Sequence, residues 1–157
     1  MLHAHAELLH PSAGNRSFMA YDLRGHQVPL DDNEGNTGAS PIDLVLMALA
    51  GCTAFDVISI LRKKRHVITT YCVEVSAAQA TNPPQVFTQV ELCHVVESRT
   101  LNEADLRSAI ELSERKYCSV GAMLSKAVNI RTIYRLNGQL HSFSDGAAHV
   151  ESHLEIA

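Results

Sequence analysis

The sequence lacks the features that mark nucleic-acid-binding proteins. Its 157 residues carry 13 Lys and Arg against 17 Asp and Glu, for a net charge of -4, and no basic stripe stands out. The one dense basic run, residues 62–65, follows a long apolar segment and is interpreted as the cationic C-terminus of a helix. We therefore expect no nucleic-acid partner.

Signals for export or membrane insertion are also missing. The first ten residues lack the charged start and the apolar core of a signal peptide. The longest apolar run, residues 44–52, is much shorter than the ~20 residues that cross a membrane. We therefore expect a cytoplasmic protein with no membrane partner. In that compartment the four cysteines favour catalytic, redox or metal roles over a permanent disulfide framework.

The motifs of several enzyme classes are absent as well. The nine histidines and four cysteines form neither a C-x-x-C nor an H-E-x-x-H spacing, so we expect no metal centre. No glycine-rich loop is suited to cradle a phosphate, and no cofactor is predicted. A cysteine hydrolase remains an alternative, because His26 and His66 are available, although no nucleophile-elbow glycines surround Cys52.

The hydrophobic patterning predicts one α+β domain over residues 1–136, followed by a loosely attached polar tail over residues 137–157. Strands are expected over residues 3–10, 16–23, 26–30, 67–78, 85–97 and 128–136. Helices are expected over residues 40–64, 103–117 and 118–127, the last either separate or a bent continuation. This order has no regular βαβ alternation, which favours the α+β class.

The helix predicted over residues 40–64 has a strong start. Ser40 can cap it, Pro41 fits its first position, and Asp43 places a carboxylate in its first turn. Its first half is apolar on every side, a pattern typical of a helix that is buried all round. A domain of this size rarely hides one helix so fully, and a second subunit could cover it.

Two of the four cysteines are candidates for chemistry. Cys118 follows a basic pair and lies near the expected start of a helix, where a thiolate is favoured. Cys52 lies a dozen residues inside its helix, so any activation must come from elsewhere in the fold. A packing role is the alternative for both. Cys72 and Cys93 fall on the more polar faces of two predicted strands, where an incidental role is expected.

Two sequence motifs, each containing one of these candidate cysteines, resemble those of a known family. Residues 40–57, SPIDLVLMALAGCTAFDV, and residues 113–130, SERKYCSVGAMLSKAVNI, resemble the OsmC/Ohr superfamily of small thiol-dependent hydroperoxide-reducing proteins. The pattern is closest to the YhfA-like branch of OsmC proteins. The resemblance covers about residues 13–136 in the same element order.

The resemblance implies an OsmC-like fold, in which β-sheets wrap two central helices of an intertwined homodimer. It also implies that Cys52 is the peroxidatic cysteine and Cys118 the resolving cysteine, and that the two approach each other at the subunit interface. An organic or lipid hydroperoxide would be the substrate. An external dithiol, such as the lipoyl proteins used by the Ohr branch, would reduce the resulting disulfide.

The sequence departs from the peroxidase branches at the groups that activate the thiol. Ile42 stands where those branches carry a glutamate, and Asp43 is the nearest carboxylate. Arg16 is the tentative match to their thiolate-stabilising arginine, with Arg24 as the alternative. A second function therefore stays open, a non-catalytic redox sensor or ligand-binding dimer on the same fold. Gly51, beside Cys52, is interpreted as room for a close approach at a crowded interface.

Overall fold

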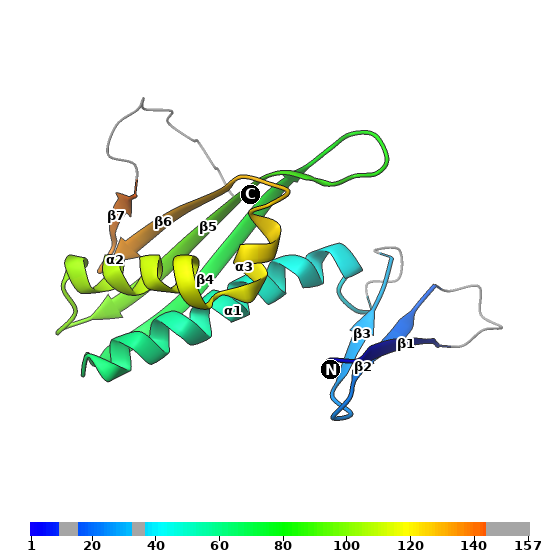
Figure 1. The fold of residues 1–157 in the computed structure, drawn as a ribbon, viewed down its shortest axis with the longest axis horizontal. Coiled ribbons are helices and arrows are strands. Elements are labelled where there is room, and N and C mark those ends of the chain that lie inside the picture. The colour runs from blue at the N-terminus through cyan, green and yellow to red at the C-terminus, as the bar shows by residue number, and fades with distance from the viewer. Residues whose placement is uncertain (10–15, 33–36, 144–157) are drawn as a thin grey trace.

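The structure, a computed structural model, describes residues 1–9, 16–32 and 37–143, and these residues form a mixed α+β fold (Figure 1). A three-stranded sheet contains β1 (Ala4–Leu8), β2 (Phe18–Asp22) and β3 (Gln27–Leu30). A four-stranded sheet contains β4 (Ile68–Gln79), β5 (Phe87–Ser98), β6 (Ile130–Leu136) and β7 (Gln139–Ser142). The helical elements are α1 (Pro41–Lys63), α2 (Glu103–Leu112), the π-helical turn η1 (Ser113–Tyr117) and α3 (Ser119–Leu124).

The N-terminal sheet is an antiparallel meander, with the strand order β1-β2-β3. The turn between β2 and β3 is closed by Asp22, whose carboxylate accepts hydrogen bonds from the backbone N–H groups of Arg24 and His26. Gly25 supplies the positive φ of 83° that this turn requires. Among the described residues the three strands pack mainly on one another, and the sheet projects beyond the start of α1 (Figure 1).

The second sheet carries the core, in the order β4-β5-β6-β7. The β4–β5 and β6–β7 pairs are antiparallel, whereas β5 and β6 are parallel because the helices α2 and α3 connect them. The strands predicted over residues 67–78, 85–97 and 128–136 are confirmed. The prediction of a loose tail from residue 137 is wrong at its beginning, because Asn137 and Gly138 form a tight turn into β7. The remainder of that tail, residues 144–157, lies outside the described residues.

Helix α1 begins as predicted. The hydroxyl of Ser40 accepts a hydrogen bond from the backbone N–H of Asp43 and donates one to its carboxylate, so the two residues cap the helix together. The prediction of a helix buried all round is wrong for the single chain. A stripe at a spacing of four residues is buried against the sheet and α2, and its members are Leu49, Thr53, Val57 and Leu61.

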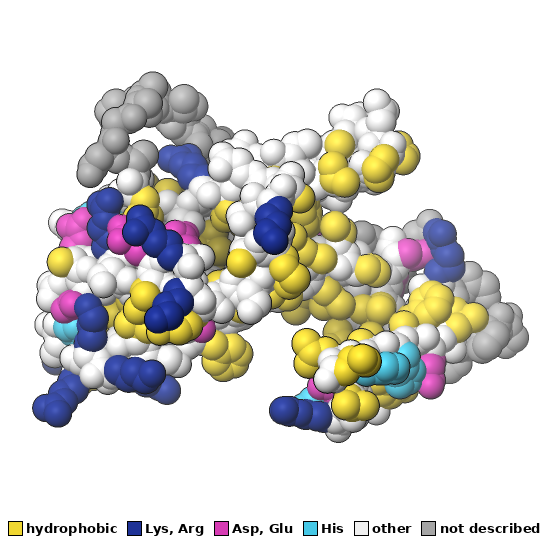
Figure 2. All heavy atoms as spheres, viewed as in Figure 1, with side chains coloured by type: hydrophobic (Ala, Val, Ile, Leu, Met, Phe, Trp, Pro, Cys, Tyr) yellow, Lys and Arg dark blue, Asp and Glu magenta, His cyan; other side chains and the backbone are white. Residues whose placement is uncertain are grey.

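The opposite face of α1 is largely uncovered. Phe55 is 77 % exposed and Met47 is 58 % exposed. By length and composition, α1 is long and apolar enough to cross a membrane. The uninterrupted apolar run over residues 44–52 did not predict this. Only 22 % of the most apolar 18-residue stretch of the helix is buried within the chain. Figure 2 shows hydrophobic side chains gathered near the middle of the molecule, between the main body and the N-terminal sheet.

The second predicted helix is interrupted. It ends at Leu112 rather than at residue 117, and the chain continues into η1, where the backbone N–H of Cys118 bonds to the carbonyl of Ser113 at 2.8 Å. This five-residue spacing inserts one extra residue in the last turn and changes the direction in which the next side chain points. A separate third helix follows, as one of the two predicted alternatives, and it starts directly after Cys118.

The core lies between the helices and one face of the larger sheet. One apolar cluster joins the C-terminal half of α1, α2 and the far ends of β5 and β6. The second surrounds Leu49, Leu92 and Cys118, with Cys52 packed against it. The opposite face of the sheet carries Cys72, which is exposed, and Cys93, which is buried.

Candidate active site

The fold brings the two predicted thiols together within one chain. Cys52 comes from the middle of α1, and Cys118 is the residue that joins η1 to α3. The Sγ atoms of Cys52 and Cys118 and a carboxylate oxygen of Asp56 all lie within 4.8 Å of one another. The pair therefore forms without a second subunit, whereas the resemblance implied that the cysteines meet at the subunit interface.

The two thiols differ in burial. Cys52 is half-buried, whereas Cys118 is only 4 % exposed. Burial raises the pKa of Cys118 to about 11, although the N–H of Gly121, 3.3 Å from its Sγ atom, has the opposite effect. Cys118 is therefore a protonated thiol at neutral pH, and Cys52 is the thiol that an incoming small molecule reaches more readily.

Asp56 is the part of this site that the sequence-based reasoning missed. It follows Cys52 by four residues, so the helix places both side chains on one flank of α1. The hydroxyl of Ser113 donates a hydrogen bond to the Asp56 carboxylate at 3.1 Å and lies 3.2 Å from the hydroxyl of Thr53. Because the hydrogen of Ser113 is already used, Thr53 is the donor in the second bond. The available signal was the C-x-x-x-D spacing within the first motif.

The donor set of this site favours thiol chemistry. Two thiols and a carboxylate are groups that bind zinc, and the three that converge here among the described residues are one fewer than the four protein ligands of a structural zinc site. Two thiols whose sulfur atoms lie within 4.8 Å of each other are also a candidate pair for reversible disulfide formation. The cluster is therefore a candidate site for thiol chemistry.

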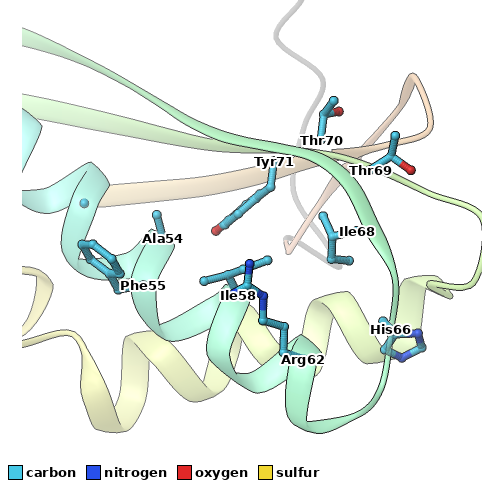
Figure 3. A pocket seen from close by; sticks show the side chains of 10 residues that line it. Ala54, Phe55, Ile58, Arg62, His66, Ile68, Thr69, Thr70 and Tyr71 are labelled. Carbon is cyan, nitrogen blue, oxygen red and sulfur yellow. The ribbon is translucent and has the colours of Figure 1, made fainter.

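Two hollows lie near α1. The smaller, of about 200 Å³, contains the Cys118 thiol and lies between α1, α3 and the sheet. The larger, of about 390 Å³, is an open groove between α1 and β4 (Figure 3). Figure 3 shows the Tyr71 hydroxyl pointing from β4 towards α1, with Ala54 and Ile58 opposite. The smaller hollow is the better candidate for a reaction chamber because the thiol of Cys118, one of the two candidate cysteines, lines it.

Comparison with known proteins gives the family. The sequence profile of the family described as "OsmC-like protein" matches residues 33–133. The protein belongs to the OsmC-like family. Protein YhfA of Escherichia coli K12 is 40 % identical over 120 residues, which cover 76 % of this chain and 90 % of that protein. The predicted family resemblance and the α+β fold class are thus confirmed.

Solved structures of OsmC-like proteins share the fold. The OsmC-like protein from Mycoplasma pneumoniae superposes with a TM-score of 0.73 at 20 % identity, covering 87 % of this chain and 96 % of that one. An organic hydroperoxide resistance protein OsmC from Legionella pneumophila gives 0.61 at 13 % identity, with coverages of 85 % and 96 %. At these identities the likeness concerns the fold alone.

The predicted activating groups of this OsmC-like protein lie apart from the thiol pair along the chain. Asp43 is the partner of Ser40 at the start of α1, nine positions before Cys52 and about 13 Å away along the helix axis. Arg16 lies just before β2 and pairs with Asp32, with 2.7 Å between its Nε atom and the carboxylate. Arg24, the alternative, is exposed in the β2–β3 turn.

The glycines near the cysteines have different environments. A Cβ atom built on Gly51 would meet nothing within 4 Å, so Gly51 is not crowded within the chain, and the prediction of a close approach there finds no support in the single subunit. A Cβ atom on Gly121 would lie 3.3 Å from the Sγ atom of Cys118 and 3.7 Å from Leu49. The close approach is therefore at the second motif, where Gly121 leaves space for the buried sulfur.

Proposed function

We propose that this OsmC-like protein is a thiol-dependent peroxidase that reduces organic or lipid hydroperoxides as part of oxidative-stress defence. The observation that carries the proposal is the Cys52–Cys118 pair, whose Sγ atoms lie within 4.8 Å of each other. Their unequal burial supports the order of events, with the half-buried Cys52 as the peroxidatic thiol and the buried Cys118 as the resolving thiol.

The proposed reaction has three steps. The Cys52 thiolate attacks the terminal oxygen of the hydroperoxide, breaks the O–O bond and becomes a sulfenic acid, while the alkoxide takes a proton and leaves as the alcohol. The Cys118 thiol then condenses with the sulfenic acid to form a disulfide and water. An external dithiol reduces this disulfide and restores both thiols, so that one hydroperoxide consumes one dithiol per cycle.

The surroundings of the pair favour an organic substrate. An apolar cluster that includes Leu49, Leu92 and Val128 contains Cys118 and packs against Cys52. A hydroperoxide with an alkyl or aryl group can bury that group against such a surface, whereas hydrogen peroxide cannot. We expect cumene hydroperoxide to be turned over faster than hydrogen peroxide, and equal rates would contradict this preference.

The uncovered face of α1 supports an intertwined homodimer as the functional form. An exposed apolar helix such as α1 needs a cover, either another protein surface or a membrane. We favour the partner subunit, because the N-terminal sheet projects away from its own body and is available to wrap a second chain (Figure 1). We also propose that the protein is cytoplasmic and that Arg16 stabilises the Cys52 thiolate.

Turnover of hydroperoxide tests the proposed function. Reduced protein supplied with excess dithiothreitol and cumene hydroperoxide should consume many equivalents of hydroperoxide per chain. Cys52→Ser should abolish consumption, and Cys118→Ser should stop it after about one equivalent unless the external thiol reduces the sulfenic acid directly. Cys72→Ser is the matched control, because Cys72 lies on the opposite face of the sheet, and it should leave the rate unchanged.

The second candidate is a redox sensor on the same fold. The placement of Asp43 and Arg16 favours it, because both bind other groups within the chain and Ile42 occupies the usual carboxylate position. A sensor would be oxidised once per chain and would not turn over when dithiothreitol is present. Absence of turnover with several organic hydroperoxides and dithiols, together with one disulfide per chain, would reject the enzyme in favour of the sensor.

A further inference from the structure

Asp56 has no task in the reaction as described so far. Its carboxylate lies within 4.8 Å of both sulfur atoms, on the same flank of α1 as Cys52. We propose that Asp56 carries the proton that moves from the Cys118 thiol to the departing oxygen when the disulfide forms. The inference rests on the proposed peroxidase function. In this site Asp56 would supply a carboxylate in place of the glutamate that the peroxidase branches carry at the position of Ile42.

The step is balanced without a further reagent. The Cys118 sulfur forms a bond to the Cys52 sulfur as the S–O bond of the sulfenic acid breaks, and the electron pair of that bond leaves with the hydroxide. The Cys118 sulfur is oxidised and the Cys52 sulfur is reduced. The proton of Cys118 passes to the Asp56 carboxylate and then to the hydroxide, so the products are one disulfide and one water.

The site needs such a group because Cys118 does not ionise by itself at neutral pH. Burial raises the pKa of Cys118 to about 11, and the charges of Cys52 and Asp56 act in the same direction. A thiol that retains its proton is a poor nucleophile, since the thiolate is the attacking species. A base within reach can remove the proton as the S–S bond forms. The same carboxylic acid can then protonate the leaving hydroxide.

The carboxylate of Asp56 is held in place by its surroundings. Ser113, which is fully buried, donates a hydrogen bond to it, and Thr53, 2 % exposed, donates to Ser113. Besides Cys52 on its own helix and Cys118 beyond η1, the titratable group near Asp56 on the packed sheet is Tyr71, whose hydroxyl is hydrogen-bonded to His94. A separation of up to 4.8 Å is closed by a small side-chain rotation or by one water.

A single-turnover experiment separates the two chemical steps. Reduced wild type, Asp56→Asn and Cys118→Ser are each mixed with one equivalent of cumene hydroperoxide. Sulfenic acid is trapped with a 1,3-diketone, and the Cys52–Cys118 disulfide is quantified by mass spectrometry after acid quenching. Glu97→Gln, an exposed carboxyl-to-amide change on β5, is the matched control.

We expect Asp56→Asn to form sulfenic acid within about twofold of the wild-type rate but to form the disulfide about 10²-fold more slowly, the lower end of what positioned acid–base groups contribute. Sulfenic acid should accumulate in this variant as it does in Cys118→Ser. Raising the pH from 7 to 10 should restore disulfide formation in Asp56→Asn, because hydroxide then removes the Cys118 proton. Asp56→Glu should recover part of the lost rate at pH 7.

The outcomes distinguish this inference from the proposed function. Disulfide formation at the wild-type rate in Asp56→Asn would overturn the role of Asp56 and leave the peroxidase proposal intact. An equal slowing of both steps, with a lowered melting temperature, would assign Asp56 a structural role only. No sulfenic acid in Cys118→Ser would overturn both proposals. Should Asp56→Asn fail to fold, Ser113→Ala keeps the carboxylate but removes its donor, and it must slow disulfide formation severalfold without slowing sulfenic acid formation.

Discussion

At the scale of single residues, the thiols of Cys52 and Cys118 differ in how far they are buried. Cys118 is enclosed by the second apolar cluster, with Gly121 leaving just enough space for its sulfur. Cys52, on the outer side of the same cluster, keeps access to solvent. A buried neutral thiol is protected from direct oxidation by a small peroxide, which suits a group that must react second.

The acidity of Cys118 can be tested by alkylation. Because burial raises the pKa of Cys118 to about 11, only roughly one thousandth of the thiol is ionised at pH 8. The rate of Cys118 alkylation by iodoacetamide in the reduced protein should rise about tenfold per pH unit from pH 8 to pH 10. Peptide mapping with an isotope-labelled reagent measures this slope independently of steric access. A plateau near pH 9 would show an ordinary thiol.

Asp56 illustrates what sequence reasoning at this scale missed. The sequence indicates the two cysteines because each lies in a recognisable motif, and it offers Asp43 as the carboxylate nearest to the motif position that Ile42 occupies. Asp56 lies in a mainly apolar stretch, although four residues after Cys52 is the spacing at which helix side chains meet. Its relation to Cys118 depends on the π-helical turn, and the helical pattern over residues 103–117 does not predict that turn.

At the scale of elements, α1 is the scaffold of the site, and its start is fixed by Ser40 and Asp43 rather than by any contact with the thiols. Ser40→Ala removes the cap and should lower the free energy of unfolding by about 1 kcal/mol. Asp43→Asn should likewise affect stability but leave the rate of Cys52 oxidation unchanged. Thermal or urea unfolding and the single-turnover rate measure the two effects. A large loss of the Cys52 oxidation rate in Asp43→Asn would contradict this expectation and show that Asp43 takes part in activating the thiol.

The larger sheet contains a second buried polar pair, between Tyr71 on β4 and His94 on β5. The Tyr71 hydroxyl is 2.8 Å from the Nδ1 atom of His94, whose ring is fully buried and whose Nε2 atom has no hydrogen-bond partner among the described residues. Desolvation lowers the pKa of His94 from 6.5 to about 3. The imidazole is therefore neutral in the folded protein at any pH near neutrality.

This lowered pKa makes stability depend on pH. Between pH 6.5 and pH 3 the unfolded chain binds a proton at His94 that the folded chain does not, so stability falls as the pH falls through this range. The contribution is up to about 1.4 kcal/mol per pH unit. His94→Leu should reduce the difference in melting temperature between pH 7 and pH 5, whatever its effect at pH 7. An unchanged difference would contradict the assignment.

At the scale of the whole molecule, α1 exposes an apolar face and the N-terminal sheet projects from the body of the chain. Both features favour a homodimer in which a second chain covers these surfaces. Phe55→Glu places a charge in the centre of that face and should convert a dimer into a monomer at micromolar concentration, as measured by light scattering after size-exclusion chromatography. Leu140→Glu is the matched control, because Leu140 is an apolar residue on β7 that is 60 % exposed, and this variant should remain dimeric. A wild-type protein that is already monomeric would contradict the proposed assembly.

The order of the helices and strands could be predicted from the sequence, but the pairing of distant strands and the burial of α1 could not. Alternating apolar residues and helix caps predicted the positions of six strands and of α1, because these signals are local. The parallel pairing of β5 with β6 depends on contacts between distant segments, whereas β7 follows β6 through a local hairpin for which the Asn137–Gly138 pair was the available signal. The apolar pattern of α1 predicted a helix covered on every side, whereas the chain itself covers only one of its faces.

The central claim is that Cys52 and Cys118 of one chain form a working redox pair. Reduced wild-type protein is treated with one equivalent of cumene hydroperoxide, and its peptides are mapped under non-reducing conditions. The account predicts a single disulfide between Cys52 and Cys118 within one chain, reversed by a dithiol, with Cys72 and Cys93 still reduced. A protein in which Cys52 stays reduced, or in which it pairs with a cysteine other than Cys118, would contradict it.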